Sequence, residues 1–546
     1  RIATDGGWPI LRPRQLPPEE VAMGEPADSG GADDALVLAL DQGTTSSRGI
    51  LFEADGNPLV VRQQEFSQFT PSPGWVEHDP EEIWESQLAT ARDAVAAAGG
   101  RPVRAIGITN QRETTILWER STGRPVAPAI VWQSRASEDV CRRLEAAGHG
   151  EEIRRRTGLL IDPYFSATKI MHLVESIDGL AERCRRGEIL FGTVDSWLIW
   201  KFTDGRVHAT DPTNASRTLL YDIHERAWSP RLAEIFGVPL SMLPEIRPSA
   251  GDFGTTHPRW FGGPLPIRSV AGDQQSAAHA QGCSRPGTAK NTYGTGAFLL
   301  FSTGQTPVAS RHGLLTTVAC QTDAAAGYLL EGSIFVAGAI VSWLRDGLGI
   351  IRQAAEIEPL AASVPDSGGV VVVPALTGLG TPYWDPAARG TILGITRGTT
   401  AAHLARAAIE SIALQVAEVA GCMQQDAGMP LERLRVDGGA AANNLLLQVQ
   451  ADLLGVPVER PLVRETTALG VAMLASRGSL DPAAARRVER VFTPSIDEPV
   501  RRRRLALWRA AVERSRGWAD VAGRTDEADH RSSVSIARPS PSPISQ

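Results

Sequence analysis

The sequence predicts an α/β protein with two large domains. The chain has 546 residues, and because a single hydrophobic core stops growing at about 250–300 residues, one core is not enough for it. Along its middle, short apolar runs alternate with stretches of helical period. A similar order of strand, glycine-containing turn and strand occurs after residue 35 and again after residue 268. One architectural unit is therefore expected twice.

The first unit begins with the apolar run ALVLALDQG over residues 35–43, which predicts a buried strand ending in a glycine turn. Residues 46–66 predict a hairpin whose turn is DGNP. Residues 79–99 predict an amphipathic helix with an aspartate at its N-cap. Residues 103–119, VRAIGITNQRETTILWE, predict a strand, a loop and a second strand.

The second unit repeats this plan. SVAGDQQ over residues 269–275 leads to a glycine-containing turn, and KNTYGTGAFLLFSTG over 290–304 predicts strand, turn and strand. Residues 434–444, LRVDGGAAANN, predict a strand followed by a glycine turn and the start of a helix at the asparagines.

Composition sets the domain limits and excludes several classes of partner. The expected segments are an unstructured extension over 1–34, a first domain over 35–283, a second domain over 284–524 and an unstructured tail over 525–546. The net charge of -7 predicts no nucleic-acid surface. No apolar run reaches the about 20 residues of a membrane span, and no signal-like segment stands near the start. The five cysteines lack CxxC spacing, so a cytoplasmic location with reduced thiols is expected.

Three loops have the residues of phosphate or nucleotide sites. In DQGTTSSRG, over residues 41–49, a strand ends in an aspartate, and backbone N–H groups and hydroxyls follow that can surround an anion. The aspartate suits a hydrated Mg²⁺. KNTYGTGAF offers a similar cradle at Thr295, and the loop after Asp437 allows close approach of a nucleotide. Each loop alone could be an ordinary turn, but three in one chain favour ATP binding.

Taken together, these motifs resemble the FGGY group of carbohydrate kinases, within the actin-like ATPase superfamily. DQGTTSSR is similar to the group's first phosphate loop, AGDQQSAAHAQGCSRPGTAKNTYGTGAF to its second, and LRVDGGAAANNLLLQVQADLLGVPVERP to its adenosine loop. The resemblance implies two actin-like, ribonuclease H-like domains with mixed five-stranded sheets flanked by helices, and an active site in the cleft between them. No G-x-x-x-x-G-K-[ST] motif is present, so a P-loop mechanism is not supported.

Within that group the first-domain segments resemble the glycerol kinases. The similarity extends from about residue 35 to 518 through PGWVEHDP, GITNQRETTILWE, TGLLIDPYFSATK and DPTNASRT. It implies transfer of the γ-phosphoryl group of MgATP to glycerol, giving sn-glycerol 3-phosphate and ADP in the first step of glycerol catabolism. ATP and Mg²⁺ would be the cofactors. We expect a homodimer or homotetramer with no membrane insertion.

The resemblance also assigns residues to the acceptor pocket. From the residues alone, Arg112 and Glu113 would form an ordinary surface ion pair, and the aromatic residues would be core. The family match instead places in the glycerol pocket Arg112, Glu113, Trp132, Tyr164, Asp273, Gln274 and Phe298. Asp273 is the expected catalytic base, because phosphoryl transfer needs a carboxylate that orients the attacking hydroxyl and accepts its proton.

The nucleotide and metal contacts follow in the same way. Asp41 would hold Mg²⁺ through water, with Asp273 as a second metal residue. The expected nucleotide contacts are Thr44, Thr45, Ser46, Arg48, Thr295, Gly338, Ser342, Gly439 and Asn443. At Ser342 the group often has glutamine, so one nucleotide contact departs from the pattern.

Two other functions remain open at this stage. The first is a kinase of the same group that acts on another polyol or a ketose such as xylulose, which a substrate panel would reveal. The second is a non-catalytic nucleotide switch or filament former of the actin-like fold, which would bind ATP but show no glycerol-dependent turnover. Asp273 and the complete set of pocket residues argue against the second.

Overall fold

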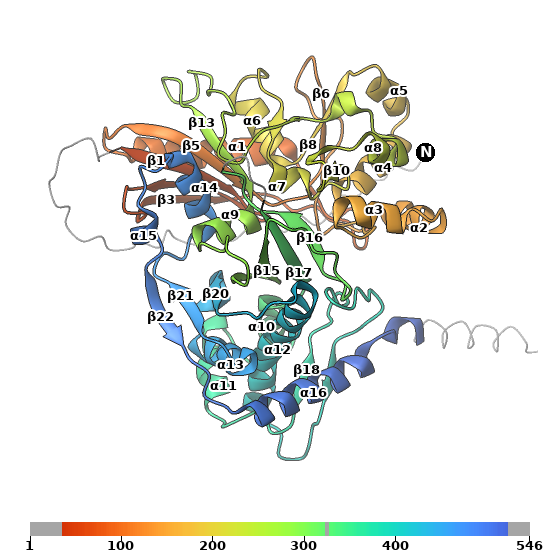
Figure 1. Ribbon diagram of the computed structural model, residues 1–546, viewed down its shortest axis with the longest axis vertical. Helices are drawn as coiled ribbons and strands as arrows, with labels where there is room; N and C mark the ends of the chain where they lie inside the picture. Colours follow the sequence, from red (N-terminus) through yellow and green to blue (C-terminus); the bar gives the residue numbers. More distant parts are fainter. Residues whose placement is uncertain (1–34, 323–326, 522–546) are drawn as a thin grey trace, which may run out of the picture.

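The computed structural model describes residues 35–322 and 327–521. The expected unstructured segments 1–34 and 525–546 lie outside these residues. Figure 1 shows two halves, one above the other, each built around a β-sheet. The first sheet has the order β13-β5-β1-β2-β3. Its strands are β1 (Leu36–Gln42), β2 (Ser46–Phe52), β3 (Pro58–Glu65), β5 (Val103–Asn110) and β13 (Ile267–Gly272).

The second sheet has the order β16-β17-β15-β14-β20-β21-β22. Its strands are β14 (Ala289–Tyr293), β15 (Ala297–Gly304), β16 (Leu315–Val318), β17 (Tyr328–Ile334), β20 (Leu434–Asp437), β21 (Val458–Pro461) and β22 (Val488–Phe492). It therefore has seven strands where five were expected, because β16 and β22 add one strand to each edge by antiparallel pairing.

The pairing pattern confirms that one unit is used twice. In the first sheet β1, β2 and β3 pair antiparallel, and β5 and β13 follow in parallel. In the second sheet β14, β15 and β17 pair antiparallel, and β20 and β21 follow in parallel. The hairpin turn between β1 and β2 thus corresponds to the turn between β14 and β15, and each turn lies in an expected phosphate loop.

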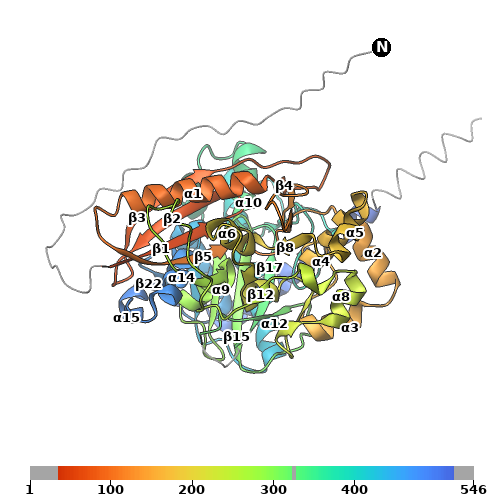
Figure 2. The same ribbon diagram turned by 90° about the horizontal axis from the view of Figure 1, so that it is seen from above.

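The alternation in β1 explains how the first sheet is covered on both faces. Leu36, Leu38 and Leu40 pack with α1 (Pro80–Ala96) and α6 (Val194–Phe202), whereas Val37 and Ala39 pack with α14 (Thr466–Ser476). Successive side chains of a strand point to opposite faces, so this run of apolar residues needs helices on both sides. Figure 2 shows α1 lying across β1, β2 and β3.

Local signals fix the starts of two helices and one hairpin turn as expected, whereas the helix expected over residues 79–99 ends at Ala96. Asp79 caps α1 through its side chain, which accepts from the backbone N–H of Glu81, and Pro80 occupies the first turn. Gly56, at φ 81°, allows the turn between β2 and β3. Asn443 caps α13 (Asn444–Leu454) by accepting from the N–H of Leu446 at 2.8 Å.

Two helices lie at the junction of the halves. α9 (Asp273–Ala280) follows β13 and contacts β14 and β15 of the second sheet. α14 belongs to the second segment by sequence, yet it packs against α9 and the strands of the first sheet. In Figure 1 it lies beside β1 and β5. A residue held by either helix is therefore close to both halves.

The remaining elements build the outer parts of each half. The first half adds the helices α2 (Glu138–Ala146), α3 (Gly150–Thr157), α4 (Ser166–Ser176), α5 (Leu180–Arg185), α7 (Pro212–Ala215) and α8 (Pro230–Phe236). Its short strand pairs are β4 (Glu77–His78) with β7 (Ala129–Ile130), β6 (Ile116–Glu119) with β8 (Ile189–Gly192), β9 (Ala209–Thr210) with β12 (Glu245–Ile246), and β10 (Tyr221–Asp222) with β11 (Ala227–Trp228).

The second half adds the helices α10 (Gly338–Asp346), α11 (Ile357–Ala362), α12 (Ala401–Ala427) and α16 (Glu498–Ser515), and the strand pair β18 (Val371–Val373) with β19 (Thr391–Leu393). The short α15 (Pro482–Ala485), like α14, packs with the first sheet through Ala485. The buried α12 and α13 pack with the second sheet in one apolar core. Within the described ranges no helix is both long enough and apolar enough to span a bilayer.

Candidate active site

The turn between β1 and β2 carries the first expected phosphate loop. Asp41 and Arg48 face each other across the two strands, with 3.6 Å between Asp41 Oδ2 and Arg48 Nε. Gly43 donates its N–H to the carbonyl of Ser46 at 2.9 Å and closes the turn. Thr45 at the tip is exposed, and Thr44 is half-buried beside it. Their hydroxyl and backbone groups therefore line an open cradle.

Arg48 connects this loop to the second segment of the chain. Its Nη1 donates to Glu465 Oε2 at 2.5 Å, and Glu465 lies at the N-cap of α14. Burial raises the pKa of Asp41 to about 6, Arg48 opposes the rise, and the nearby carboxylates of Glu465 and Asp273 add to it. The negative charge is thus only partly balanced at this point, which favours a bound cation.

The turn between β14 and β15 forms the second cradle. Thr295 is exposed between two glycines, and its carbonyl accepts from the N–H of Ala337 at 2.8 Å and of Ala339 at 3.1 Å. Gly338 donates to the carbonyl of Gly294 at 2.9 Å, and a Cβ at Gly338 would stand 2.6 Å from that oxygen. The missing side chain lets the start of α10 dock against the turn.

The expected adenosine loop lies against the end of β14, beside the second turn. Gly438 has φ 83°, and a Cβ there would collide with the backbone of Tyr293, whereas Gly439 is exposed with open space beside it. Asn443 uses its side-chain oxygen as the cap of α13, so its amide nitrogen is the group left for a ligand. Ser342 lies on the exposed face of α10.

Three expected pocket aromatics meet, although they come from distant segments. The ring of Trp132 lies 5.6 Å from that of Tyr164 and 5.9 Å from that of Phe298, measured between centroids. Trp132 Nε1 donates to Thr44 Oγ1 at 3.0 Å, which ties this apolar wall to the first phosphate loop. A wall of this kind suits the carbon chain of a small polyol.

Arg112 and Glu113 are buried, so the surface ion pair suggested by the residues alone is wrong. Arg112 Nε lies 3.9 Å from Glu113 Oε1, and each side chain has a closer partner elsewhere. Arg112 makes a two-point contact with Glu331, at 2.7 and 2.9 Å, while Glu113 accepts from Arg217 Nε at 2.6 Å. Glu113 also has φ 62°, which is uncommon for a residue with a side chain and typical of functional sites.

Asp273 is the first residue of α9, and its carboxylate lies beside Arg112. Its Oδ1 lies 3.3 Å from Arg112 Nε and accepts from the N–H of Gln274 at 2.7 Å. The side chain is 30% exposed, unlike its buried neighbours, so it can reach a ligand. The Gln274 side chain is buried, and its Oε1 accepts from Lys290 Nζ at 2.5 Å. Lys290 thus fixes the amide that stands beside Asp273.

Sequence reasoning did not single out Arg217, Lys290, Glu331 or Glu465 as site residues. Two signals were available: Lys290 is one of three lysines in the chain, and Glu331 is a charged residue within the apolar strand LLEGSIF. A charge at a buried position is rare unless it is paired. Their partners, however, could be identified only once the chain was folded.

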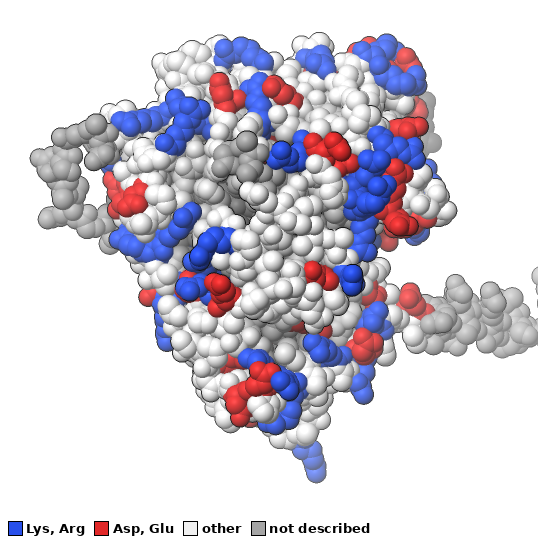
Figure 3. Space-filling view, viewed as in Figure 1, with Lys and Arg blue, Asp and Glu red and all other residues white. Residues whose placement is uncertain are grey.

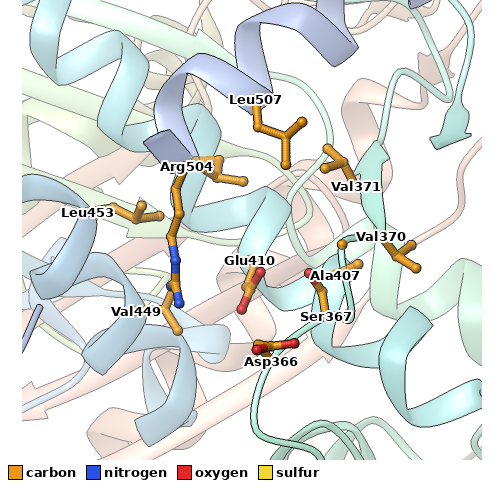
Figure 4. Close-up of a pocket in the computed structure, with 12 residues that line it drawn as sticks. Asp366, Ser367, Val370, Val371, Ala407, Glu410, Val449, Leu453, Arg504 and Leu507 are labelled. Carbon is orange, nitrogen blue, oxygen red and sulfur yellow. The ribbon is translucent and has the colours of Figure 1, made fainter. Parts of the chain in front are cut away.

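A second cavity lies in the second half, away from these loops. It has about 210 Å³ and is lined by α12, α13, α16 and the segment before β18, as Figure 4 shows. Its Glu410 is paired with Arg406 at 2.8 Å, and its Asp366 accepts from the N–H of Gly368 at 2.8 Å. None of the predicted site residues lines this cavity, so the junction of the halves, where they gather, is the better candidate for an active site.

Comparison with known proteins gives consistent family matches for both parts of the chain. The model of the N-terminal domain of the FGGY family of carbohydrate kinases matches residues 36–280, and that of the C-terminal domain matches residues 289–479. A glycerol kinase of Bordetella parapertussis is 55% identical over 496 residues, which cover 89% of this chain and 98% of that protein. One of Ralstonia nicotianae is 55% identical over 488 residues, 88% of this chain and 98% of that protein.

Solved structures give the same result. The chain matches a crystal structure of Plasmodium falciparum glycerol kinase with ADP at a TM-score of 0.82 and 35% identity, covering 88% of this chain and 98% of that one. A xylulose kinase of Rhodospirillum rubrum matches at a TM-score of 0.76 and 23% identity, covering 91% and 100%, which shows a common fold alone. The chain belongs to the FGGY family of carbohydrate kinases.

Proposed function

We propose that the chain is an ATP:glycerol 3-phosphotransferase, which transfers the γ-phosphoryl group of MgATP to glycerol and gives sn-glycerol 3-phosphate and ADP. The observation that carries this proposal is that Arg112, Glu113 and Asp273 lie together beside the aromatic wall of Trp132, Tyr164 and Phe298. Arg217 joins the two groups, because it donates to Glu113 and lies over the ring of Tyr164. A small uncharged triol needs such a set, because its hydroxyls require fixed donors and acceptors and its carbons require an apolar surface. The relatives that are 55% identical are glycerol kinases.

In this reaction Asp273 acts on the attacking hydroxyl. Its carboxylate accepts the hydroxyl proton as the oxygen approaches the γ-phosphorus, while Arg112 and Glu113 hold the neighbouring hydroxyls. The transition state for phosphoryl transfer is loose, so catalysis depends on alignment and on balancing charge more than on strong base catalysis. Closure of the halves around both substrates would exclude water and limit hydrolysis of ATP.

The nucleotide occupies the loops at the junction. Thr44, Thr45, Ser46 and Arg48 would surround the phosphates together with Thr295, and Gly338, Ser342, Gly439 and Asn443 would line the rest of the nucleotide. For the phosphates to enter, Arg48 must exchange its contact with Glu465 for one with an oxygen of ATP, which the 30% exposure of the Arg48 side chain permits.

The residues at the phosphate loops also fit Mg²⁺. Asp41, through water, and Asp273 would supply carboxylate oxygens, the type of ligand that Mg²⁺ prefers. Burial is the main cause of the raised pKa of Asp41, and a cation beside it would stabilise the charged carboxylate. Residues 35–322 and 327–521 contain no cluster of three or more side chains able to hold a metal, so water and ATP oxygens would complete the coordination. Bound with ATP, Mg²⁺ neutralises charge on the phosphates.

The remaining assignments rest on the family and the composition. We assign the protein to the cytoplasm, as a homodimer or homotetramer. In Figure 3 acidic and basic side chains are interspersed on the face shown, and the net charge is -7, so no nucleic-acid partner is assigned.

The test is coupled release of ADP from the purified protein with ATP and a panel of glycerol, dihydroxyacetone, glyceraldehyde, xylulose and ribitol. We expect the highest kcat/KM with glycerol. A higher kcat/KM with xylulose or ribitol would keep the assignment as a kinase and overturn the assignment of glycerol as its substrate. ATP binding without turnover on any polyol would favour the nucleotide switch.

A further inference from the structure

Four charged side chains form a buried ion cluster beneath the polyol pocket: Arg112, Glu113, Arg217 and Glu331. Each is at most 3% exposed. Glu331 accepts from Arg112 at 2.7 and 2.9 Å and lies 3.1 Å from Arg217 Nη2, while Glu113 accepts from Arg217 Nε at 2.6 Å. The cluster holds two positive and two negative groups, so removal of any one leaves an unbalanced buried charge.

The members of the cluster come from both halves of the molecule. Arg112 and Glu113 follow β5, and Arg217 follows α7, all in the first half. Glu331 lies in β17 of the second sheet, opposite Leu300 on one side and Leu315 on the other. β17 reaches the junction of the halves in Figure 1. One carboxylate of the second half, that of Glu331, therefore contacts the guanidinium groups of two arginines of the first half.

The hydrogen bonds of Arg112 show what Glu331 does to it. A guanidinium has five N–H donors. Nη1 donates to Glu331 and to Gln275 Oε1, at 2.7 and 3.1 Å, and Nη2 donates once to Glu331 at 2.9 Å. The N–H of Nε, near Asp273 and Glu113, and one N–H of Nη2 remain. The contact with Glu331 thus sets which edge of Arg112 faces the pocket.

Arg217 depends on the same carboxylate. Its Nη1 and Nη2 are buried and form no hydrogen bond among the described residues, so the ion pair between Nη2 and Glu331, at 3.1 Å, is the contact that holds this end of the guanidinium. The guanidinium lies over the rings of Tyr164 and Phe165, at 5.4 and 5.2 Å from their centroids. Although burial alone would raise it, the pKa of Glu331 is lowered to about 2 by Arg112 and Arg217, so its charge is present at every working pH.

We propose that Glu331 is a positioning residue for the polyol acceptor: from the second sheet it orients Arg112 and Arg217, and through them Glu113, toward the acceptor hydroxyls. The inference rests on the proposed function and deepens it, because the acceptor site is then complete only when the second half supplies Glu331. Glu331 itself touches no substrate and takes no proton.

The test compares Glu331→Gln with Glu418→Gln. Glu418 is also a buried glutamate of the second half, and it accepts from Tyr383 and Trp508 at 2.8 Å, away from the polyol pocket. For Glu331→Gln we expect the KM for the acceptor to rise about tenfold or more, because the charge that fixes Arg112 is lost. The KM for ATP should change by less than about twofold. Glu418→Gln should leave both constants near the wild-type values.

A second variant keeps the test decisive if Glu331→Gln does not fold. Glu331→Asp retains the charge but is shorter, so we expect an intermediate rise in the KM for the acceptor. An unchanged KM for the acceptor in either folded variant would overturn the proposal. An equal rise in both KM values would also overturn it, since that result indicates a purely structural role.

Measurements on the wild-type protein distinguish failure of the inference about Glu331 from failure of the proposed function. If it turns over another polyol better than glycerol, the substrate assignment fails and the variants are measured with that polyol. If no polyol supports ADP release, the proposed function fails, and glycerol binding by calorimetry decides the role of Glu331. Equal affinity of wild type and Glu331→Gln for glycerol would then reject the inference.

Discussion

Trp132 donates from its indole Nε1 to the hydroxyl of Thr44 at 3.0 Å, so one hydrogen bond joins the wall of the proposed polyol pocket to the loop proposed to bind phosphate. Trp132 also contacts the rings of Tyr164 and Phe298. The two proposed substrate regions therefore share a side chain, and a change in one region should be measurable in the other.

We predict that Trp132→Phe raises the KM for both glycerol and ATP. The new ring keeps most of the wall but cannot donate to Thr44, and a neutral hydrogen bond contributes about 1 kcal/mol, or roughly fivefold in affinity. Phe298→Leu is the matched control, because Phe298 packs against the same wall and should affect the KM for glycerol alone. Steady-state kinetics with each substrate varied in turn would reveal this difference. An unchanged KM for ATP in Trp132→Phe would contradict it.

Asp273→Asn is expected to lower kcat by about 10² to 10⁴, the usual range for a general base. The substitution keeps the size of the side chain but removes the carboxylate that accepts the hydroxyl proton. ATP affinity, measured by equilibrium dialysis, should stay close to that of the wild type. Asp252→Asn changes an exposed aspartate in a turn of the first half and should leave kcat unaltered. Retention of more than about a tenth of kcat in Asp273→Asn would rule out the assigned role.

Much of this arrangement could be predicted from local sequence. The alternation of Leu36, Leu38 and Leu40 with Val37 and Ala39 predicts a strand buried on both faces, and the structure shows helices on both. The turns after β1 and β14, which we propose as phosphate loops, are predicted by glycines and hydroxyl residues directly after strands. Such signals depend on a few neighbouring residues, so they can be recognised before the fold is known.

The buried ion cluster could not be predicted in the same way. Glu113 and its partner Arg217 are 104 residues apart, and Arg112 and Glu331 are 219 apart. No local rule connects charges at such separations. From the residues alone Arg112 and Glu113 resemble a solvent-exposed pair, because nothing nearby shows that a strand of the other half covers them. The packing of α14 on the first sheet is non-local for the same reason.

The pH dependence of stability should change in Asp195→Asn. Burial raises the pKa of Asp195 from 3.8 to about 7, against the opposing hydrogen bonds from Thr193 and Thr210. The folded protein therefore binds this proton more tightly than the unfolded chain does. The resulting stability is full below about pH 3.8 and is lost as the pH rises through about 7.

Asparagine cannot titrate, so the variant should lack this part of the pH dependence. Between about pH 5 and pH 8 the free energy of unfolding of the wild type should fall more steeply than that of Asp195→Asn, by an amount on the order of 1–3 kcal/mol. Urea midpoints of the two proteins across this range would measure the difference. Parallel curves would show that Asp195 does not titrate in this way.

Gly470 and Gly421 provide the last prediction, because both are helical glycines with opposite surroundings. In α14 a Cβ at Gly470 would collide with the backbone carbonyl of Ser276 in α9, whereas a Cβ at Gly421 in α12 would meet nothing within 4 Å. Alanine is the better helix former at both positions by about 1 kcal/mol. Gly421→Ala should therefore raise the Tm slightly. Gly470→Ala should lower it, since forcing apart α9 and α14 costs about 1–3 kcal/mol. Because these two helices lie at the junction of the halves, Gly470→Ala should also lower kcat/KM, and a rise in Tm for both variants would refute the close packing at Ser276.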